Sequence, residues 1–264
     1  SGLKDRRGLT SQWFSLHLPG KNLDVDPNAL RELGITLLRQ SRHNKKLRIG
    51  THKANRFHIR LRNFSDDGSF HTRIRQIIQQ GIPNYFGPQR FGHHGHNVND
   101  ALHWVEKNEL PAERELRGRV LSTLRAWLFN GELAQRIASG HWLQWQAGDP
   151  VLLDGSHSFF HTDAWDDTLQ QRFNEGDIHI GTWLWSADHP GCAPQPISDY
   201  LAKAALSAET RALRLLPRDL TVEEQGDDCI LHFNLPTGSY ATSLLRELLA
   251  LNDRSVPAHP LQQN

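Results

Sequence analysis

The residue best suited to chemistry is Asp5, a carboxylate that stands between Lys4 and the pair Arg6 and Arg7. Neighbouring cations stabilise the ionised form of a carboxyl group, so we expect Asp5 to remain an anion that rarely holds a proton. A permanently charged carboxylate on a short loop is a candidate nucleophile. The alternative is a solvated loop with a local ion pair, which contributes little to stability.

Charge is distributed unevenly along this nearly neutral chain, whose formal net charge is +1. Residues 1–92 contain 17 Lys and Arg against 6 Asp and Glu, whereas residues 93–264 contain 13 against 23. This asymmetry indicates a polyanionic partner that is held by the first part of the chain. Attraction between the two oppositely charged regions is the alternative, and the alternation of basic with aromatic residues favours nucleic acid.

Length and composition argue against a membrane protein and against a secreted disulfide-rich protein. The 264 residues suit one large domain or two modest ones, and no apolar run approaches the roughly 20 residues of a membrane helix. The chain does not start with a secretory signal, and its two cysteines, Cys192 and Cys229, are too few for a disulfide framework. We therefore expect a cytoplasmic protein without a membrane segment, and a monomer.

Hydrophobic periodicity and turn residues predict the elements that must position these groups. The clearest strand covers residues 55–62: Phe57, Ile59 and Leu61 point to one face, and the alternate residues face anionic solvent or RNA. The alternate residues are Arg56, His58, Arg60 and Arg62. Further strands are predicted over residues 12–18 and 35–42, with a hairpin at Gly226-Asp227 between residues 220–224 and 229–235.

Helices are predicted over residues 27–34, 69–80 and 240–251, with Asp26 and Ser239 as N-caps of the first and last. Residues 97–215 read as mostly helical, with loops around 147–164 and 185–197. One apolar helix face is predicted there from Leu201, Ala205, Leu213 and Leu216. The turn-rich segment 81–92 coincides with the reversal of charge, so it is the expected domain boundary.

Other groups of polar residues are only weak candidates for a metal, catalytic or cofactor site. His93, His94 and His96 lack a further ligand at zinc spacing, and Asp163, Asp166 and Asp167 fit the first turn of a helix better than a metal site. Ser156-His157-Ser158 lacks a nucleophile elbow, and no phosphate-binding glycine loop is present. We expect neither a metal nor an organic cofactor.

Aromatic residues beside cations remain, at Phe57, Tyr85, Phe86 and Tyr240. Rings next to cationic groups are suited to stacking on a flipped or single-stranded base. Ordinary core packing is the alternative for each ring, and it is weaker for Tyr85 and Phe86 because they stand in a turn.

Four segments together resemble the TruD family of tRNA pseudouridine synthases. Residues 2–13 (Gly-Leu-Lys-Asp-Arg-Arg-Gly-Leu-Thr-Ser-Gln-Trp) resemble its catalytic loop, and residues 42–62 resemble its basic run and Asn-x-Phe strand. Residues 81–92 (Gly-Ile-Pro-Asn-Tyr-Phe-Gly-Pro-Gln-Arg-Phe-Gly) are similar to the most recognisable family motif, and residues 235–243 to the C-terminal one. The four segments follow the same order as in the family and are spread over nearly the whole chain. Residues 97–215 resemble the family more loosely.

The resemblance implies an α+β fold, in which a mixed β-sheet catalytic domain is interrupted by a largely helical inserted domain. Residues 1–82 and 218–264 would form the catalytic domain, and residues 83–217 the insert. The family carries a basic residue before the catalytic loop, so we expect the N-terminal part of the catalytic domain to be missing. Ala54 stands where family members commonly have glycine, a departure at the start of the strand.

The resemblance also implies a reaction without a cofactor. Asp5 would be the catalytic aspartate for converting a uridine of tRNA, usually uridine 13, to pseudouridine after base flipping. Phe57 would stack on the target base, Asn55 would hold the loop or the base, and the junction would shape the RNA cleft. The residues expected to bind substrate or RNA are Phe57, Asn55, Lys4, Arg6, Arg7, Lys45, Lys46, Arg48, Asn84, Tyr85, Phe86, Arg90 and Tyr240.

Two rival functions share some of these features. A non-catalytic RNA-binding protein would have the same basic face and aromatic residues, although the aspartate in its basic loop argues against it. A metal-dependent nuclease would need clustered carboxylates in the basic region, where Asp66-Asp67 is the one adjacent pair.

Overall fold

The computed structural model describes residues 8–18, 20, 25–48 and 52–249. It divides into two compact units, Ser1–Lys53 and Ala54–Asn264. The first unit contains the predicted first helix, α1 (Pro27–Glu32), in which the Asp26 side chain accepts a hydrogen bond of 2.8 Å from the backbone N–H of Asn28. Proline at the start of a helix costs no hydrogen bond, because its missing N–H has no partner in the first turn.

Two strand predictions in the first unit are wrong. Residues 12–18 and 35–42 have no strand pairing, and large apolar side chains such as Phe14, Leu16 and Leu38 are exposed. An alternating apolar pattern forms a strand only where a neighbouring strand takes up its backbone N–H and C=O groups. The described residues of this unit supply no such neighbour.

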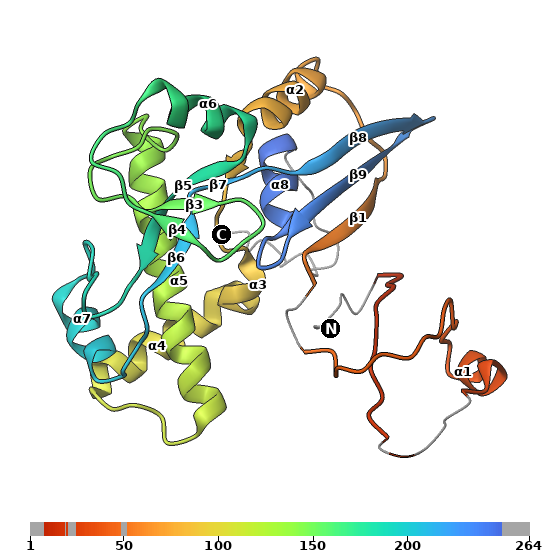
Figure 1. Ribbon diagram of the computed structural model, residues 1–264, viewed down its shortest axis with the longest axis horizontal. Coiled ribbons are helices and arrows are strands. Elements are labelled where there is room, and N and C mark those ends of the chain that lie inside the picture. Colours follow the sequence, from red (N-terminus) through yellow and green to blue (C-terminus); the bar gives the residue numbers. More distant parts are fainter. Residues whose placement is uncertain (1–7, 19, 21–24, 49–51, 250–264) are drawn as a thin grey trace, which may run out of the picture. The chain divides into compact units, whose positions relative to one another are not determined.

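The second unit is organised by a three-stranded antiparallel sheet of order β1-β9-β8. Its strands are β1 (Ala54–Leu61), β8 (Arg218–Gln225) and β9 (Asp228–Pro236), and Figure 1 shows them projecting together at one end of this unit. The register places Asn55 opposite Leu235 and Phe57 opposite Phe233. Both the predicted alternation along β1 and the hairpin at Gly226-Asp227 are confirmed.

Two helices, α2 (Phe70–Gln80) and α8 (Ala241–Leu248), contribute to a core on one face of this sheet. We call this cluster the sheet core, and its buried members are Phe70, Ile74, Ile77, Ile82, Leu215, Leu220, Cys229, Leu231, Phe233, Leu235, Leu244 and Leu248. The predicted helix 69–80 is confirmed. The Ser239 cap is wrong: α8 begins at Ala241 with Tyr240 as its N-cap, and no side-chain cap bond forms.

The longer helices between these segments are α4 (His96–Lys107), α5 (Arg114–Ala138), α6 (Asp167–Glu175) and α7 (Gln195–Ala202). They accompany a four-stranded antiparallel sheet that the sequence did not predict. Its strands are β3 (Val151–Leu153), β4 (Phe159–Phe160), β5 (Ile178–Leu184) and β6 (Glu209–Ala212), in the order β4-β3-β5-β6. The first five residues of β5 are all buried, so this strand lacks the alternation by which half-buried strands are recognised.

The predicted helix face from Leu201 to Leu216 is also wrong. Helix α7 ends at Ala202, and Leu213 lies at a bend between β6 and β7 (Arg214–Leu215). Strand β7 pairs with β2 (Ile82–Pro83), which begins the junction that continues through α3 (Pro88–Phe91) and the 3₁₀ turn η1 (His93–Gly95). The α+β class is confirmed. No helix in the described part of the chain is long and apolar enough to cross a membrane.

Gly81 provides a test of this arrangement. It ends α2 at a φ of +76°, and a Cβ there would lie 2.6 Å from the carbonyl oxygen of Leu215. Gly68 has a similar φ of +82°, but no atom lies within 4 Å of its hypothetical Cβ.

We expect Gly68→Ala to lose about 1–2 kcal/mol of unfolding free energy from left-handed strain. Gly81→Ala should lose that amount and a further ~1–3 kcal/mol from the clash. Urea titration of both variants measures the difference, and equal losses would contradict the close approach of α2 to β7.

Candidate active site and RNA-binding surfaces

The junction motif is held by Arg211 of β6, a residue that the sequence analysis did not single out. Its Nε and Nη2 atoms donate to the carbonyl oxygen of Asn84, at 3.1 and 3.0 Å, and Nη2 also donates to Asn84 Oδ1 at 2.8 Å. Asn84 is buried, and its amide donates in turn to the Ala212 carbonyl at 2.9 Å. The side-chain amide and the backbone carbonyl of Asn84 are thus hydrogen-bonded within the protein. These bonds attach the junction to β6.

Arg211 also connects the junction to the C-terminal motif. Its Nη1 donates to the carbonyl oxygen of Gly238 at 3.2 Å, and its Cζ atom lies 3.9 Å from the centre of the Phe86 ring. The edge of Phe86 meets Tyr240 with ring centres 6.3 Å apart. Burial lowers the pKa of Arg211 to about 10, Tyr240 opposes this shift and Arg90 adds to it. The guanidinium therefore remains charged at neutral pH.

The backbone groups of Tyr85 and Phe86 are held by hydrogen bonds from side chains of two helices. Ser243 of α8 donates its hydroxyl to the Tyr85 carbonyl at 3.3 Å. Asn130 of α5 accepts from the Phe86 N–H at 2.9 Å and donates to its carbonyl at 3.0 Å. The structure brings together Asn84, Tyr85, Phe86, Arg90 and Tyr240. Their binding of RNA stays a prediction.

Asn55 and Phe57 lie at the start of β1, next to the strand end that leads into the 236–240 turn. Phe57 is half-buried, and its ring is stacked on Phe233 at 5.2 Å between centres with 20° between planes. It packs against the sheet core. Its stacking on a base stays a prediction, because the ring also serves the packing of the sheet.

Substitution of Phe57 separates the two roles. Stacking of a base on a ring is worth about 1–3 kcal/mol and an aliphatic side chain cannot replace it. For the reaction that the family resemblance implies, we expect Phe57→Tyr to retain substantial activity and Phe57→Leu to lose much more, in single-turnover assays at matched fractions of folded protein. Equal rates would assign Phe57 to the core.

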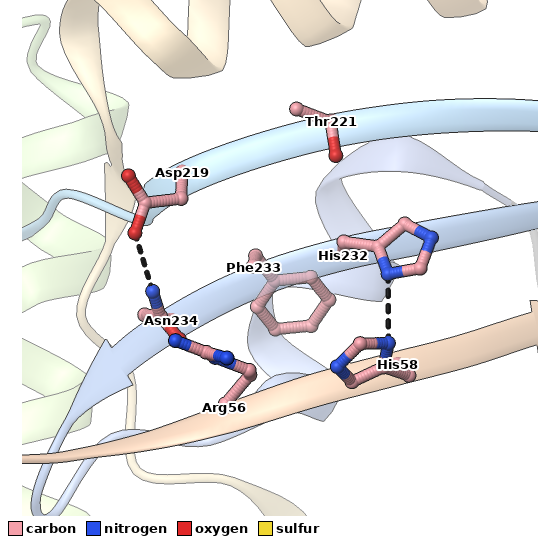
Figure 2. Close-up of a pocket in the computed structure, with 7 residues that line it drawn as sticks. All are labelled: Arg56, His58, Asp219, Thr221, His232, Phe233 and Asn234. Atoms are coloured by element: carbon pink, nitrogen blue, oxygen red, sulfur yellow. Dashed lines mark hydrogen bonds between the residues drawn. The ribbon is translucent and has the colours of Figure 1, made fainter.

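The opposite face of the sheet carries a hollow of about 350 Å³, drawn in Figure 2. Arg56 Nε donates to Asn234 Oδ1 at 3.4 Å, and Asn234 Nδ2 donates to Asp219 Oδ2 at 2.5 Å. Asp219 has a φ of +54° and lies where the β8–β9 register shifts, which is how a bulge re-aims a side chain. This chain of donors and acceptors is suited to binding a polar ligand.

The same hollow contains a pair of imidazoles. The Nδ1 atoms of His58 and His232 lie 2.8 Å apart across the strands. One ring must be neutral at Nδ1 to accept the bond, since an imidazolium has no acceptor nitrogen. The residues around the hollow offer hydrogen bonds, but no nucleophile paired with a general base.

The basic run of the first unit is open to solvent. Lys45, Lys46 and Arg48 are exposed, and the backbone N–H of Leu47 donates to the Ser15 hydroxyl at 3.1 Å. The turn before it is closed by His43, whose ring bonds the Lys45 backbone at 3.0 Å. The run thus has a defined backbone within its unit and carries exposed cationic side chains.

Neutralising this run tests its role. We expect replacement of Lys45, Lys46 and Arg48 by Gln to weaken tRNA binding and flatten its salt dependence. Each lost phosphate contact changes the log–log slope by roughly one unit. Filter binding over a range of salt concentrations measures the slope, and exposed Arg31, replaced by Gln, controls for charge loss in the same unit. An unchanged slope would contradict RNA binding by the run.

The acidic candidates are Asp5, which stands in the basic loop with Lys4, Arg6 and Arg7, and the adjacent pair Asp66-Asp67. Lys4, Asp5, Arg6 and Arg7 lie outside the described residues. Asp66 accepts from the backbone N–H groups of Gly68 and Phe70, at 2.8 and 3.1 Å, and so stabilises the start of α2.

The neighbouring Asp67 carboxylate accepts hydrogen bonds from Arg73 and Ser69, which hold its pKa well below the usual range. Both members of the pair thus serve the turn before α2 rather than a metal. Nowhere in the described residues do three or more His, Cys, Asp and Glu side chains gather as they would around a metal ion.

Arg211 was missed because no local signal marks it. It stands in a short strand of mixed polarity, and its partners Asn84 and Gly238 are 127 and 27 residues away. A buried arginine is recognised only when its acceptors are known, since its fork of N–H groups must find oxygens in three dimensions.

Comparison with known proteins agrees with this arrangement of motifs. The family model described as tRNA pseudouridine synthase D (TruD) matches residues 1–109 and 197–248, which include all four motif segments. The chain belongs to the TruD family. The resemblance inferred from the motifs is therefore confirmed.

Several curated TruD proteins are similar along most of their length. The tRNA pseudouridine synthase D of Nitrosococcus oceani is 40% identical over 265 residues, covering 94% of this chain and 74% of that protein. The tRNA pseudouridine synthase D of Stutzerimonas stutzeri is 41% identical over 266 residues, covering 95% and 76%. A solved structure of a candidate TruD protein from Methanosarcina mazei has a TM-score of 0.54 at 17% identity, covering 87% of this chain and 77% of that one, and supports the TruD fold.

Proposed function

We propose that this protein is a tRNA pseudouridine synthase that isomerises a uridine of tRNA to pseudouridine. The observation that carries the proposal is membership of the TruD family, with 40% identity to a curated TruD protein over 94% of the chain. The clustering of the junction and C-terminal motifs around Arg211 supports it. These findings do not favour a non-catalytic RNA-binding protein. The expected target is uridine 13, in keeping with the family that the motifs resemble.

Asp5 is the catalytic residue in this proposal. The N1–C1′ bond of the flipped uridine breaks with help from the carboxylate, the uracil turns, and C5 bonds to C1′ in place of N1. The C5 hydrogen then leaves to solvent as a proton, and N1 gains a proton. The reaction is an isomerisation without net oxidation or reduction, so it needs no redox cofactor.

The remaining residues bind and orient the RNA. Phe57 stacks on the target base and Asn55 holds the loop or the base, while Tyr240 and the junction shape the cleft. The exposed cations Lys45, Lys46 and Arg48 add electrostatic attraction to phosphates.

We also propose the domain organisation: residues 1–82 and 218–264 as the catalytic domain, with residues 83–217 inserted. The pairing of β1 with β9 across the insert and the separate sheet of the insert support this division. The protein acts as a monomer in the cytoplasm, where tRNA is modified.

The Asp5→Asn variant tests the mechanism. Asparagine has nearly the same shape but is neither an anion nor a useful nucleophile. We expect pseudouridine formation to be abolished while tRNA affinity stays similar or rises slightly, because one negative charge leaves a basic loop. Tritium release from C5-labelled tRNA measures the first quantity, and filter binding measures the second.

Three other results would contradict the proposed role of Asp5 or the proposed reaction. Wild-type turnover in Asp5→Asn would overturn the mechanism, and loss of binding together with activity would make Asp5 structural. Cleaved RNA, or activity that EDTA abolishes, would point to the metal-dependent nuclease instead.

A further inference from the structure

Two arginines share one aromatic ring at the junction. The Cζ atoms of Arg211 and Arg90 lie 3.9 and 5.6 Å from the centre of the Phe86 ring. Arg211 comes from β6 and Arg90 from α3, so the fold itself brings the two cations together. We call Arg90 and Arg211 the arginine pair.

Within the described residues, no carboxylate forms an ion pair with either member of the pair. The hydrogen-bond acceptors of Arg211 are the neutral oxygens of Asn84 and Gly238. Arg90 has a long bond of 3.5 Å to the Ser122 hydroxyl, and its buried Nε has no acceptor among the described residues. Among the other buried or partly buried arginines, Arg125 and Arg136 are bonded to Glu209 and Asp149. Buried Arg214 donates to the Phe173 and Ile178 carbonyls without a carboxylate ion pair among the described residues, but the negative charge of Asp154 acts on it.

Two like charges near each other, without a counter-ion, are unfavourable in a partly buried site. Burial is the main cause of the lowered pKa of Arg211, and the positive charge of Arg90 lowers it further. An anion placed between them would relieve this repulsion. The planar N–H fork of Arg90 matches the oxygens of a phosphate, which favours phosphate among anions. Arg211 contributes mainly its charge, because most of its donors already serve Asn84 and Gly238.

We propose that Arg90 and Arg211 form a binding site for one phosphodiester of the substrate tRNA, next to Tyr240. This inference rests on the proposed function for the identity of its ligand. Phe86 holds both guanidinium groups by its ring face and Asn84 fixes Arg211, so the site is preorganised before RNA arrives. The role of Asn84 is then indirect: it positions Arg211 rather than touching RNA.

The salt dependence of tRNA binding tests the site. The variants are Arg211→Gln and Arg90→Gln, which remove the charge, and Arg211→Lys, which keeps it. Arg172→Gln is the matched control, because Arg172 also lies over a phenylalanine ring, that of Phe160 at 5.9 Å, but is neutralised by Asp177 at 2.6 Å. Filter binding of an unmodified tRNA transcript at several salt concentrations gives the slope of log Kd against log salt.

We expect the slope to fall by about 0.7–0.9 in each glutamine variant of the arginine pair. It should stay at the wild-type value in Arg211→Lys and Arg172→Gln. A wild-type slope in Arg90→Gln or in folded Arg211→Gln overturns the proposal, and so does an equal fall in Arg172→Gln. If circular dichroism shows that Arg211→Gln does not fold, Arg90→Gln decides.

Failure of the phosphate-site proposal can be distinguished from failure of the proposed isomerase function. Tritium release by the wild-type protein tests the isomerase reaction without reference to the arginine pair. An active enzyme with unchanged slopes refutes the phosphate site alone. An inactive wild-type protein whose variants show the expected slopes refutes the isomerase and leaves an RNA phosphate site.

Discussion

The antiparallel pairing of β1 with β9 is the interaction on which the candidate site depends. Residues Ala54 to Leu61 pair one for one with Pro236 to Cys229, and they close one face over the sheet core. The pairing sets Asn55 beside the strand that runs into the 236–240 turn. That turn meets the junction through Gly238 and Tyr240, so one strand pair fixes how three motifs approach each other.

Arg211 satisfies backbone carbonyl groups where the junction meets the C-terminal motif. A junction between two sheets leaves carbonyl groups without ladder partners, and buried carbonyls need donors. The guanidinium supplies several donors to Asn84 and Gly238 at once. The same group carries a charge that forms no ion pair with a carboxylate among the described residues, and the proposed phosphate site depends on that charge.

Sequence reasoning succeeded where the signal was local. The alternation on β1, the Gly226-Asp227 hairpin and the Asp26 cap all depend on neighbouring residues, and all are present. Strand β5 was missed because it is buried on both faces, and residues 12–18 were assigned as a strand although no neighbour pairs with them. In the candidate site, contiguous motifs revealed Asn84, Phe86 and Tyr240, but Arg211 acts through partners distant in sequence.

The long separation of β1 from β9 has a consequence for synthesis. Arg56 and Asn234 are 178 residues apart, so at 5–20 residues per second β1 leaves the ribosome roughly 10–35 s before its partner. During that interval Phe57, Ile59 and Leu61 lack the strand that completes their packing. Exposed apolar strands aggregate unless charges interrupt them. Charged residues at the alternate positions of β1, Arg56 and Arg60, and Arg62 just after the strand are of the kind that limits such pairing.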